Sequence, residues 1–249
     1  GNYNLLEKYM LSFTLRVDGS SVFGSNNKWA YLPSVATAWL LHREAFMEDV
    51  TWLSFAKLRL SYGQVGNQAV QPYRTLGVVN EYFYKFGENE PNYAALPSGE
   101  LYNPNLKWEV SESANLGIEL GFLNNRITID AEVYNTDTRD LIVNRSIDAS
   151  LGYTNMYDNL GIVQNRGLEI TAGYDVIRSN AFQWNVNVNF SSNKNEIKRI
   201  TGEVDEEGNP IDDINNNWFI GQPINVYYDY EFDGIWQLDD DIANSHMPD

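Results

Sequence analysis

The sequence comprises 249 residues, enough for one large domain or two ordinary ones, and its 34 acidic and 17 basic residues give a formal charge of −17. A surface with that charge repels polyphosphate, which argues against nucleic acid as a partner. Because there is no cysteine, a disulfide framework and cysteine-based zinc sites are excluded. Aromatic residues, which favour strands, reach 14%, and the many Asn and Gly residues favour turns, so the composition indicates an all-β protein.

The distribution of apolar residues shows whether the sequence is compatible with a membrane-spanning helix or with a β-barrel. No apolar run approaches the roughly 20 residues that a membrane-spanning helix needs. A closed β-barrel, whose strands are only half apolar, remains compatible with the sequence. Residues 1–4 show neither the basic start nor the apolar core of a signal peptide, so we expect that segment to be absent.

Apolar and polar residues alternate along several segments, which predicts strands with one apolar and one polar face. These segments are 11–17, 56–62, 115–122, 127–133, 168–174 and 184–190. The predicted strands are about 9 to 12 residues long, against about 5 to 6 for a usual strand. A soluble β-sandwich produces the same alternation with its apolar face in the core, so the alternation alone leaves both folds open.

The connections between the predicted strands differ in length in an ordered way. Strand ends fall alternately on a long-loop side and a short-turn side, and only 42–51 is longer than expected on the short side. Outer-membrane barrels have short periplasmic turns and long extracellular loops, so we predict an antiparallel transmembrane β-barrel segment. The short turns are 121–125 and 177–181, and the long connections are 18–33, 64–107, 144–161 and 193–223.

Aromatic residues near the predicted strand ends are candidates for the girdles at the two membrane interfaces. Ordinary packing at strand edges is the alternative for each of them. The candidates are Tyr9, Trp39, Trp52, Tyr62, Trp108, Tyr134 and Trp184.

A series of motifs, in order along nearly the whole chain, resembles the SusC/RagA-type TonB-dependent outer-membrane transporters. The string RVDGSSVFG at 16–24 and the string NKWAYLPS at 27–34 resemble one hairpin of that family, although the family often has Arg where this chain has Val22. Each motif is weak alone, but the ordered series is specific. The other matching segments are 58–68, 103–109, 122–126, 134–141, 165–169, 221–223 and 233–237.

The resemblance implies a barrel of roughly 22 strands, of which this chain would supply about ten. In that family a plug domain fills the barrel, a SusD-like surface lipoprotein caps it, and TonB energises import of oligosaccharides or peptides across the outer membrane. We expect residues 1–249 to belong to the barrel domain, with the plug domain, the signal peptide and the terminal strand absent. The partners implied are the SusD-like lipoprotein, TonB, outer-membrane lipid and the transported substrate.

No pattern in the sequence indicates a catalytic, cofactor or metal site, so we predict that the chain is not an enzyme. His42 and His246 have no metal-like spacing with another ligand. The acidic loop that begins at Asp205 does not reproduce an EF-hand, and a solvated loop is favoured over calcium binding there.

Aromatic residues in the long connections are the candidates for contact with substrate, because their rings stack on sugar faces and pack on peptides. Packing of the loops on one another or on a lipoprotein is the alternative. A secreted β-sandwich that binds carbohydrate, and an all-β glycoside hydrolase with two facing carboxylates, remain alternative functions. The substrate candidates are Tyr82, Tyr84, Tyr93, Tyr102, Tyr153, Tyr157 and Trp218.

Overall fold

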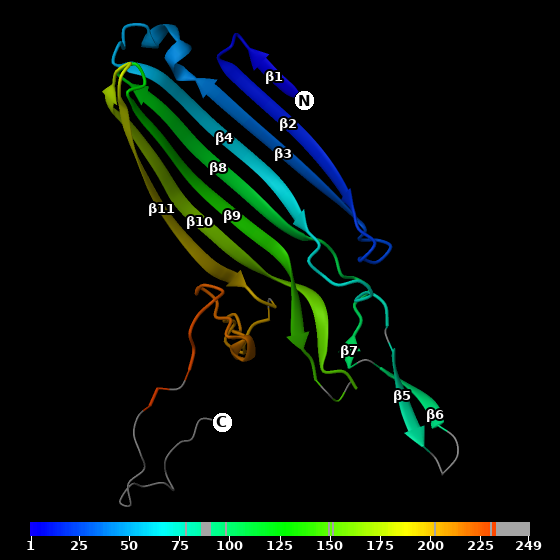
Figure 1. The fold of residues 1–249 in the computed structure, drawn as a ribbon. Helices are drawn as coiled ribbons and strands as arrows, with labels where there is room; N and C mark the ends of the chain where they lie inside the picture. The colour runs from blue at the N-terminus through cyan, green and yellow to red at the C-terminus, as the bar shows by residue number, and fades with distance from the viewer. Residues whose placement is uncertain are drawn as a thin grey trace, which may run out of the picture.

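The computed structural model describes residues 1–77, 79–85, 91–97, 99–148, 150, 152–201, 203–229 and 231–232. Within them, eight strands follow one another in a single curved antiparallel sheet, in the order β1-β2-β3-β4-β8-β9-β10-β11 (Figure 1). The all-β, antiparallel prediction is confirmed. The strands of this path are β1 (Asn2–Leu5), β2 (Tyr9–Gly19), β3 (Trp29–Leu40), β4 (Leu53–Asn67), β8 (Glu109–Phe122), β9 (Ile127–Ser146), β10 (Asn155–Arg178) and β11 (Gln183–Arg199).

Three further strands lie in the connection between β4 and β8. A separate antiparallel pair consists of β5 (Val79–Lys85) and β6 (Pro91–Pro97), and the two-residue β7 (Glu100–Leu101) pairs in parallel with the start of β10. None of the helices among the described residues is long and apolar enough to span a bilayer.

The strands are longer than the alternation predicted, since β9 has 20 residues and β10 has 24. The apolar alternation ends near Val133 and Leu168, but the ladder continues through pairs such as Asp137 with Gln164. Polar strands keep pairing beyond the apolar band because every backbone N–H and C=O still needs a partner. The predicted late segment 233–237 lies outside the described residues.

The two ends of the sheet carry connections of different length (Figure 1). At one end the strands turn through 6–8, 123–126 and 179–182, and through 41–52, which holds the 3₁₀ turns η1 (Leu41–Arg43) and η2 (Ala45–Met47). The opposite end carries 20–28, 68–108, 147–154 and the residues after Arg199. The predicted sorting is confirmed, with 41–52 as the predicted exception, since it is longer than 20–28 and 147–154. We call these the short-turn end and the long-loop end.

One face of the sheet carries the apolar residues of every strand in register. Leu60, Leu116, Val133 and Leu168 form one such cross-strand row. Within the described residues no second sheet packs on this face, and Leu60 remains 53% exposed. A sandwich would bury such a face, whereas a barrel turns it toward lipid, so the structure favours the barrel.

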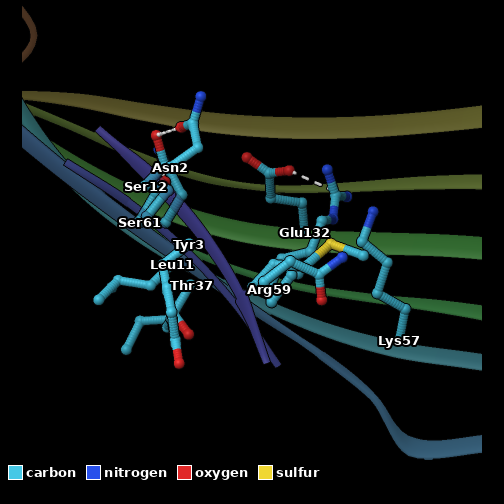
Figure 2. A pocket seen from close by; sticks show the side chains of 16 residues that line it. Asn2, Tyr3, Leu11, Ser12, Thr37, Lys57, Arg59, Ser61 and Glu132 are labelled. Atoms are coloured by element: carbon cyan, nitrogen blue, oxygen red, sulfur yellow. Dashed lines mark hydrogen bonds and ion pairs between the residues drawn. The ribbon is translucent and has the colours of Figure 1, made fainter. Parts of the chain in front are cut away.

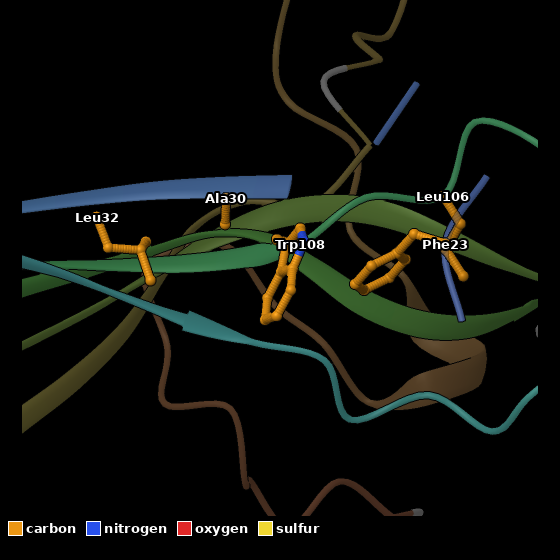
Figure 3. Close-up of a cluster of buried hydrophobic side chains, with 5 residues drawn as sticks. All are labelled: Phe23, Ala30, Leu32, Leu106 and Trp108. Atoms are coloured by element: carbon orange, nitrogen blue, oxygen red, sulfur yellow. The ribbon is translucent and has the colours of Figure 1, made fainter. Parts of the chain in front are cut away.

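The buried core of the molecule lies at the long-loop end, where β3 and β4 diverge. β3 pairs with β4 only from Ser34 to Leu40, so the first half of β3 has β2 alone as its partner. Side chains from loops 20–28 and 103–108 fill the gap, with the Trp108 ring 5.3 Å from that of Phe23 (Figure 3). We call this the wedge cluster: Phe23, Ala30, Leu32, Leu106 and Trp108.

Aromatic residues of the predicted girdles have different environments in the structure. At the short-turn end Tyr9 stacks on Trp39, and Trp52 stacks on Phe122. Trp184 remains 51% exposed near the same end. The girdle prediction is wrong for Trp108, which is buried in the wedge cluster, where its indole N–H donates to the Lys28 carbonyl oxygen.

Candidate functional site

The face of the sheet opposite the apolar band is polar and forms a side-chain network across neighbouring strands. Asn115 donates to the Ser61 hydroxyl oxygen, and Ser113 shares a hydrogen bond with Thr136. Tyr134, predicted for a girdle, lies on this face instead, where its hydroxyl oxygen accepts a hydrogen bond from the Asn193 amide at 2.7 Å. The amides and hydroxyls of this face suit a wet lumen, since they satisfy one another without excluding water.

A charge network crosses three strands of this polar face, toward the short-turn end. Arg59 of β4 lies 3.0 Å from a Glu119 oxygen and 2.8 Å from one of Asp130. It also lies 3.4 Å from a Glu132 oxygen, the contact that Figure 2 shows. Lys57 reaches the same Glu119 oxygen at 3.0 Å. Three carboxylates therefore surround two cations, and each charge is partly compensated.

Gly117 makes room for this network. Gly117 lies between Arg59 and Glu132 in one cross-strand row, and a Cβ atom added to it would lie 3.0 Å from the Arg59 guanidinium. The absent side chain thus lets the guanidinium reach across β8 to the carboxylates of β9. A small residue at this position keeps that path open, since a larger side chain would occupy the space of the guanidinium.

A concave region of about 610 Å³ lies beside this network, where β1 and β2 meet β3 and β4 (Figure 2). Asn2, Ser12, Ser61 and Arg59 contribute polar groups to it, and Asn2 accepts a hydrogen bond from Ser12. Of the predicted substrate residues whose side chains the structure describes, namely Tyr102, Tyr153, Tyr157 and Trp218, none lines this region.

The long-loop end holds a second set of polar contacts, which ties distant parts of the 68–108 connection to one another and to the start of β10. Arg74 and Glu100 form an ion pair at 2.6 Å with both side chains mostly buried. The Arg74 guanidinium also lies over the Tyr157 ring, 5.3 Å from its centre. Asn103 donates from its side chain to the Tyr157 carbonyl oxygen and from its backbone to that of Arg74. Separate parts of the long-loop end thus converge on Arg74.

The structure places all seven predicted substrate residues in the connections of the long-loop end or next to them. The four whose side chains it describes, Tyr102, Tyr153, Tyr157 and Trp218, do not share one cluster. Tyr102 is 46% exposed, and Tyr153 and Tyr157 are half-buried on or beside the segment that pairs with β7. Trp218 packs in a separate apolar cluster against Val163, Ile197 and Ile200. Their contact with substrate stays a prediction.

The remaining three predicted residues belong to the β5–β6 pair. Tyr82 and Tyr84 pair with Ala94 and Asn92, and Tyr93 pairs with Phe83. The side chains of these tyrosines lie outside the described part of the structure.

The acidic loop at Asp205 is a compact turn. The Asp205 carboxylate accepts hydrogen bonds from the backbone N–H groups of Asn209 and Glu207, and the Asn209 contacts lower the pKa of that carboxyl below its ordinary value. Among the described residues no group of three or more His, Cys, Asp or Glu side chains is arranged to hold a metal ion. The carboxylate oxygens of Asp205 serve the turn itself.

These features define a class of protein: a sheet with a lipid-facing apolar side, a charged inner side and loops sorted to one end is part of a transmembrane β-barrel wall. The family model described as "TonB dependent receptor-like, beta-barrel" matches residues 1–244. The chain belongs to this family, and the barrel lies in the outer membrane.

Comparison with individual relatives narrows the family assignment. The chain is 36% identical to TonB-dependent receptor SusC of Bacteroides thetaiotaomicron, over 92% of this chain and 24% of that protein. It is 33% identical to TonB-dependent receptor P26 of Formosa agariphila, over 100% of this chain and 25% of that protein. The chain thus spans about a quarter of the length of the curated relatives it matches.

Solved structures agree with the sequence relatives. The structure of the RagAB peptide transporter superposes with a TM-score of 0.75 at 26% identity, covering 89% of this chain and 24% of that one. The "open-open" state of the RagAB peptide importer gives a TM-score of 0.71 at 27% identity, covering 80% and 21%. The SusC/RagA-type assignment made from the motifs is confirmed.

Sequence reasoning missed the two charged centres at Arg59 and Arg74. The alternation of apolar and polar residues assigned four charged residues to the polar face: Lys57, Arg59, Asp130 and Glu132. Their pairing, however, depends on the register between β4 and β8. Residues 68–108 separate those strands, so no local turn reveals their register. The Arg74 centre joins separate loop segments and carries no periodic signal.

Proposed function

We propose that the chain forms part of the wall of an outer-membrane transporter that imports nutrients with energy supplied through TonB. The main support for this proposal is that one sheet has an exposed apolar face on one side and a charged, hydrogen-bonded face on the other. That arrangement separates lipid from an aqueous lumen. It gives the chain a role in passage across the membrane.

The sorted loops support a partner on the cell surface. The long-loop end carries buried clusters and converging polar contacts, so it presents shaped connections to the outside. We propose that a SusD-like lipoprotein covers this end and that TonB acts from the short-turn side through regions beyond this chain. SusC and RagAB, to which the chain is similar, support a partnered transporter of this type.

The cargo we propose is an oligosaccharide or a peptide. Tyr102 and Tyr153 present exposed or half-exposed rings at the mouth, and aromatic faces bind both sugars and peptide side chains. RagAB, whose barrel wall superposes on this chain, is a peptide importer, which favours a peptide among the two.

The chain has no proposed catalytic role of its own. The carboxylates of Asp130 and Glu132 on the inner face are both engaged by the Arg59 guanidinium.

The test uses the full-length receptor expressed with its own signal sequence. We expect it in the outer membrane as a detergent-requiring species whose gel mobility shifts on heating, and we expect its deletion to abolish growth on the cognate oligosaccharide or peptide. Recovery as a soluble periplasmic protein would refute the barrel, and unchanged uptake after deletion would refute the import function.

The substrate residues are tested by the double variant Tyr102→Ala/Tyr153→Ala in the full-length receptor. Loss of two ring contacts should raise the substrate concentration for half-maximal uptake roughly tenfold, equal to about 1.4 kcal/mol. The matched control is Phe182→Ala, an exposed aromatic in the short β10–β11 turn, which should leave uptake unchanged. Equal uptake by all three proteins would remove the two tyrosines from the site.

A further inference from the structure

A compact group of cations lies on the outward face of β10 and β11. Lys194 lies 2.9 Å from a Glu196 oxygen and Arg166 lies 3.9 Å from the same oxygen. Lys198 pairs with the other oxygen of that carboxylate. We call Arg166, Lys194 and Lys198 the cation cluster. Three cations share one carboxylate here, in a chain whose acidic residues outnumber its basic ones two to one.

The register makes this cluster electrostatically costly. Arg166 and Lys194 are direct cross-strand partners on β10 and β11. Like charges opposite one another destabilise a sheet. Glu196 offsets part of the repulsion but leaves two net positive charges. A sheet has no structural need for that excess, so a further anion would complete the cluster.

The apolar band fixes the level of the cluster along the barrel axis. Arg166 lies two residues from Leu168 on β10, and Lys194 lies four residues from Phe190 on β11, each with the same side-chain parity as its apolar neighbour. β10 begins at the long-loop end and β11 finishes there, so both cations lie on the long-loop side of those apolar residues. The cluster therefore lies just above the lipid-facing band, at the extracellular boundary of the membrane.

The cations are accessible and their carboxylate is not. The Arg166 and Lys194 side chains are 54% and 57% exposed and Lys198 is 38% exposed, whereas Glu196 is only 14% exposed. Arg matches phosphate oxygens with two parallel N–H donors, and Lys supplies a mobile point charge. The shielded Glu196 holds the three side chains together and leaves outward donors for a ligand.

We propose that the cation cluster binds the phosphate group of a lipid headgroup in the outer leaflet. The chemistry recognised is a phosphate monoester on a glycolipid such as lipid A. Basic residues beside a lipid-facing surface attract anionic headgroups, and the adjoining apolar rows of Leu168 and Phe190 accommodate the acyl chains of the same molecule. The proposal rests on the membrane orientation and is independent of what the transporter carries.

The experiment measures lipid retained by the full-length receptor after detergent exchange. Purified receptor is incubated with bisphosphorylated lipid A or with enzymatically dephosphorylated lipid A, and bound lipid is counted by native mass spectrometry. The variant Arg166→Gln/Lys194→Gln/Lys198→Gln should lower the affinity for the phosphorylated lipid at least tenfold, because each charge-assisted contact is a strong one. Dephosphorylated lipid A should bind wild type as weakly as the phosphorylated lipid binds the variant.

The matched control removes exposed, singly paired cations elsewhere. Arg16→Gln/Arg43→Gln alters one residue of the inner face and one of the short-turn end, and it should retain wild-type binding. Mobility shift on heating verifies that each variant has folded.

Glu196→Gln separates a lipid site from a merely structural ion cluster. If the cations serve a phosphate, removal of the competing carboxylate should tighten binding of lipid A several-fold. Three results would overturn the proposal: equal binding by the triple variant and wild type, equal binding of both lipids, or full displacement of lipid A by inorganic phosphate, which would make free phosphate the ligand.

Discussion

The short-turn end and the long-loop end of the same sheet are held by different kinds of interaction. At the short-turn end the β8–β9 turn is local, and Leu123, Asn124 and Asn125 all take positive φ angles. At the long-loop end, contacts such as Trp108 with Lys28 join residues far apart in the sequence. The β8–β9 turn is specified by the conformation of neighbouring residues, whereas the wedge cluster depends on side chains that are distant in the sequence.

The largest expected effect comes from the wedge cluster at the long-loop end. Trp108→Ala should lower the free energy of unfolding of the full-length receptor by about 3–5 kcal/mol, because it empties a buried site. The measurement is the midpoint of heat-induced loss of the folded gel band.

Trp52→Ala is the matched control at the other end, since that indole is 58% exposed and stacks on Phe122. Its effect should be clearly smaller. If Trp52→Ala and Trp108→Ala lowered the thermal midpoint equally, the two ends would not differ in how much buried side chains stabilise them.

The next effect concerns the inner face between the two ends. Gly117→Val should cost about 1–3 kcal/mol, because the added methyl groups overfill the space taken by the Arg59 guanidinium. Gly117→Ala should be tolerated, since its single Cβ meets only the flexible end of that side chain. Denaturant titration followed by tryptophan fluorescence measures both, and a valine variant as stable as the alanine variant would contradict the crowding.

A smaller effect is expected in the β8–β9 turn. Asn125→Val should destabilise by about 1 kcal/mol, because a β-branched residue fits the left-handed conformation poorly. Asn125→Gly should be neutral or stabilising there. Thermal loss of the folded gel band compares the two variants. Destabilisation by glycine as large as that by valine would show that side-chain contacts, and not backbone conformation, define the turn.

The smallest effect is a dependence on pH at the short-turn end. Glu44 accepts hydrogen bonds from the Trp39 indole and the Tyr9 hydroxyl, and these contacts, with that of Lys8, lower the pKa of its carboxyl. The resulting stabilisation is present above the ordinary carboxyl pKa and is lost as pH falls through the lowered value.

Glu44→Gln should therefore flatten the slope of stability against pH in the acidic range and change little at neutral pH. Thermal midpoints of wild type and variant across that range provide the measurement. Parallel curves for the two proteins would show that the Glu44 contacts are not linked to folding.

The sequence allowed prediction of features that depend on short-range patterns. Parity along 127–133 assigned Asp130 and Glu132 to the polar face, and the Asn124–Asn125 turn placed β8 beside β9. Strand length was underestimated because polar strand ends such as Gln164 pair without an apolar signal. Trp108 was misplaced because proximity to a strand end says nothing about whether a loop folds over the ring.

The candidate site was predictable only as a location. Tyr102 was correctly expected in a long connection, whereas Tyr157 lies in β10, which starts earlier than predicted. The ion pair that organises that end joins Arg74 to Glu100. Neither residue lies in an alternating segment, and their approach requires the loop to return beside β10 through β7. Such contacts form where the chain folds back over many residues. No periodic pattern in the sequence shows which of those residues will meet.

The divergence of β3 from β4 has a mechanical consequence. From Ser34 to Leu40 the two strands are joined by a ladder of backbone hydrogen bonds. Beyond Ser34, toward the long loops, side-chain packing in the wedge cluster joins the two strands in place of that ladder. Because the ladder ends at Ser34, local opening of the wall on that side of it breaks no β3–β4 backbone hydrogen bond, and we expect opening to begin along this seam.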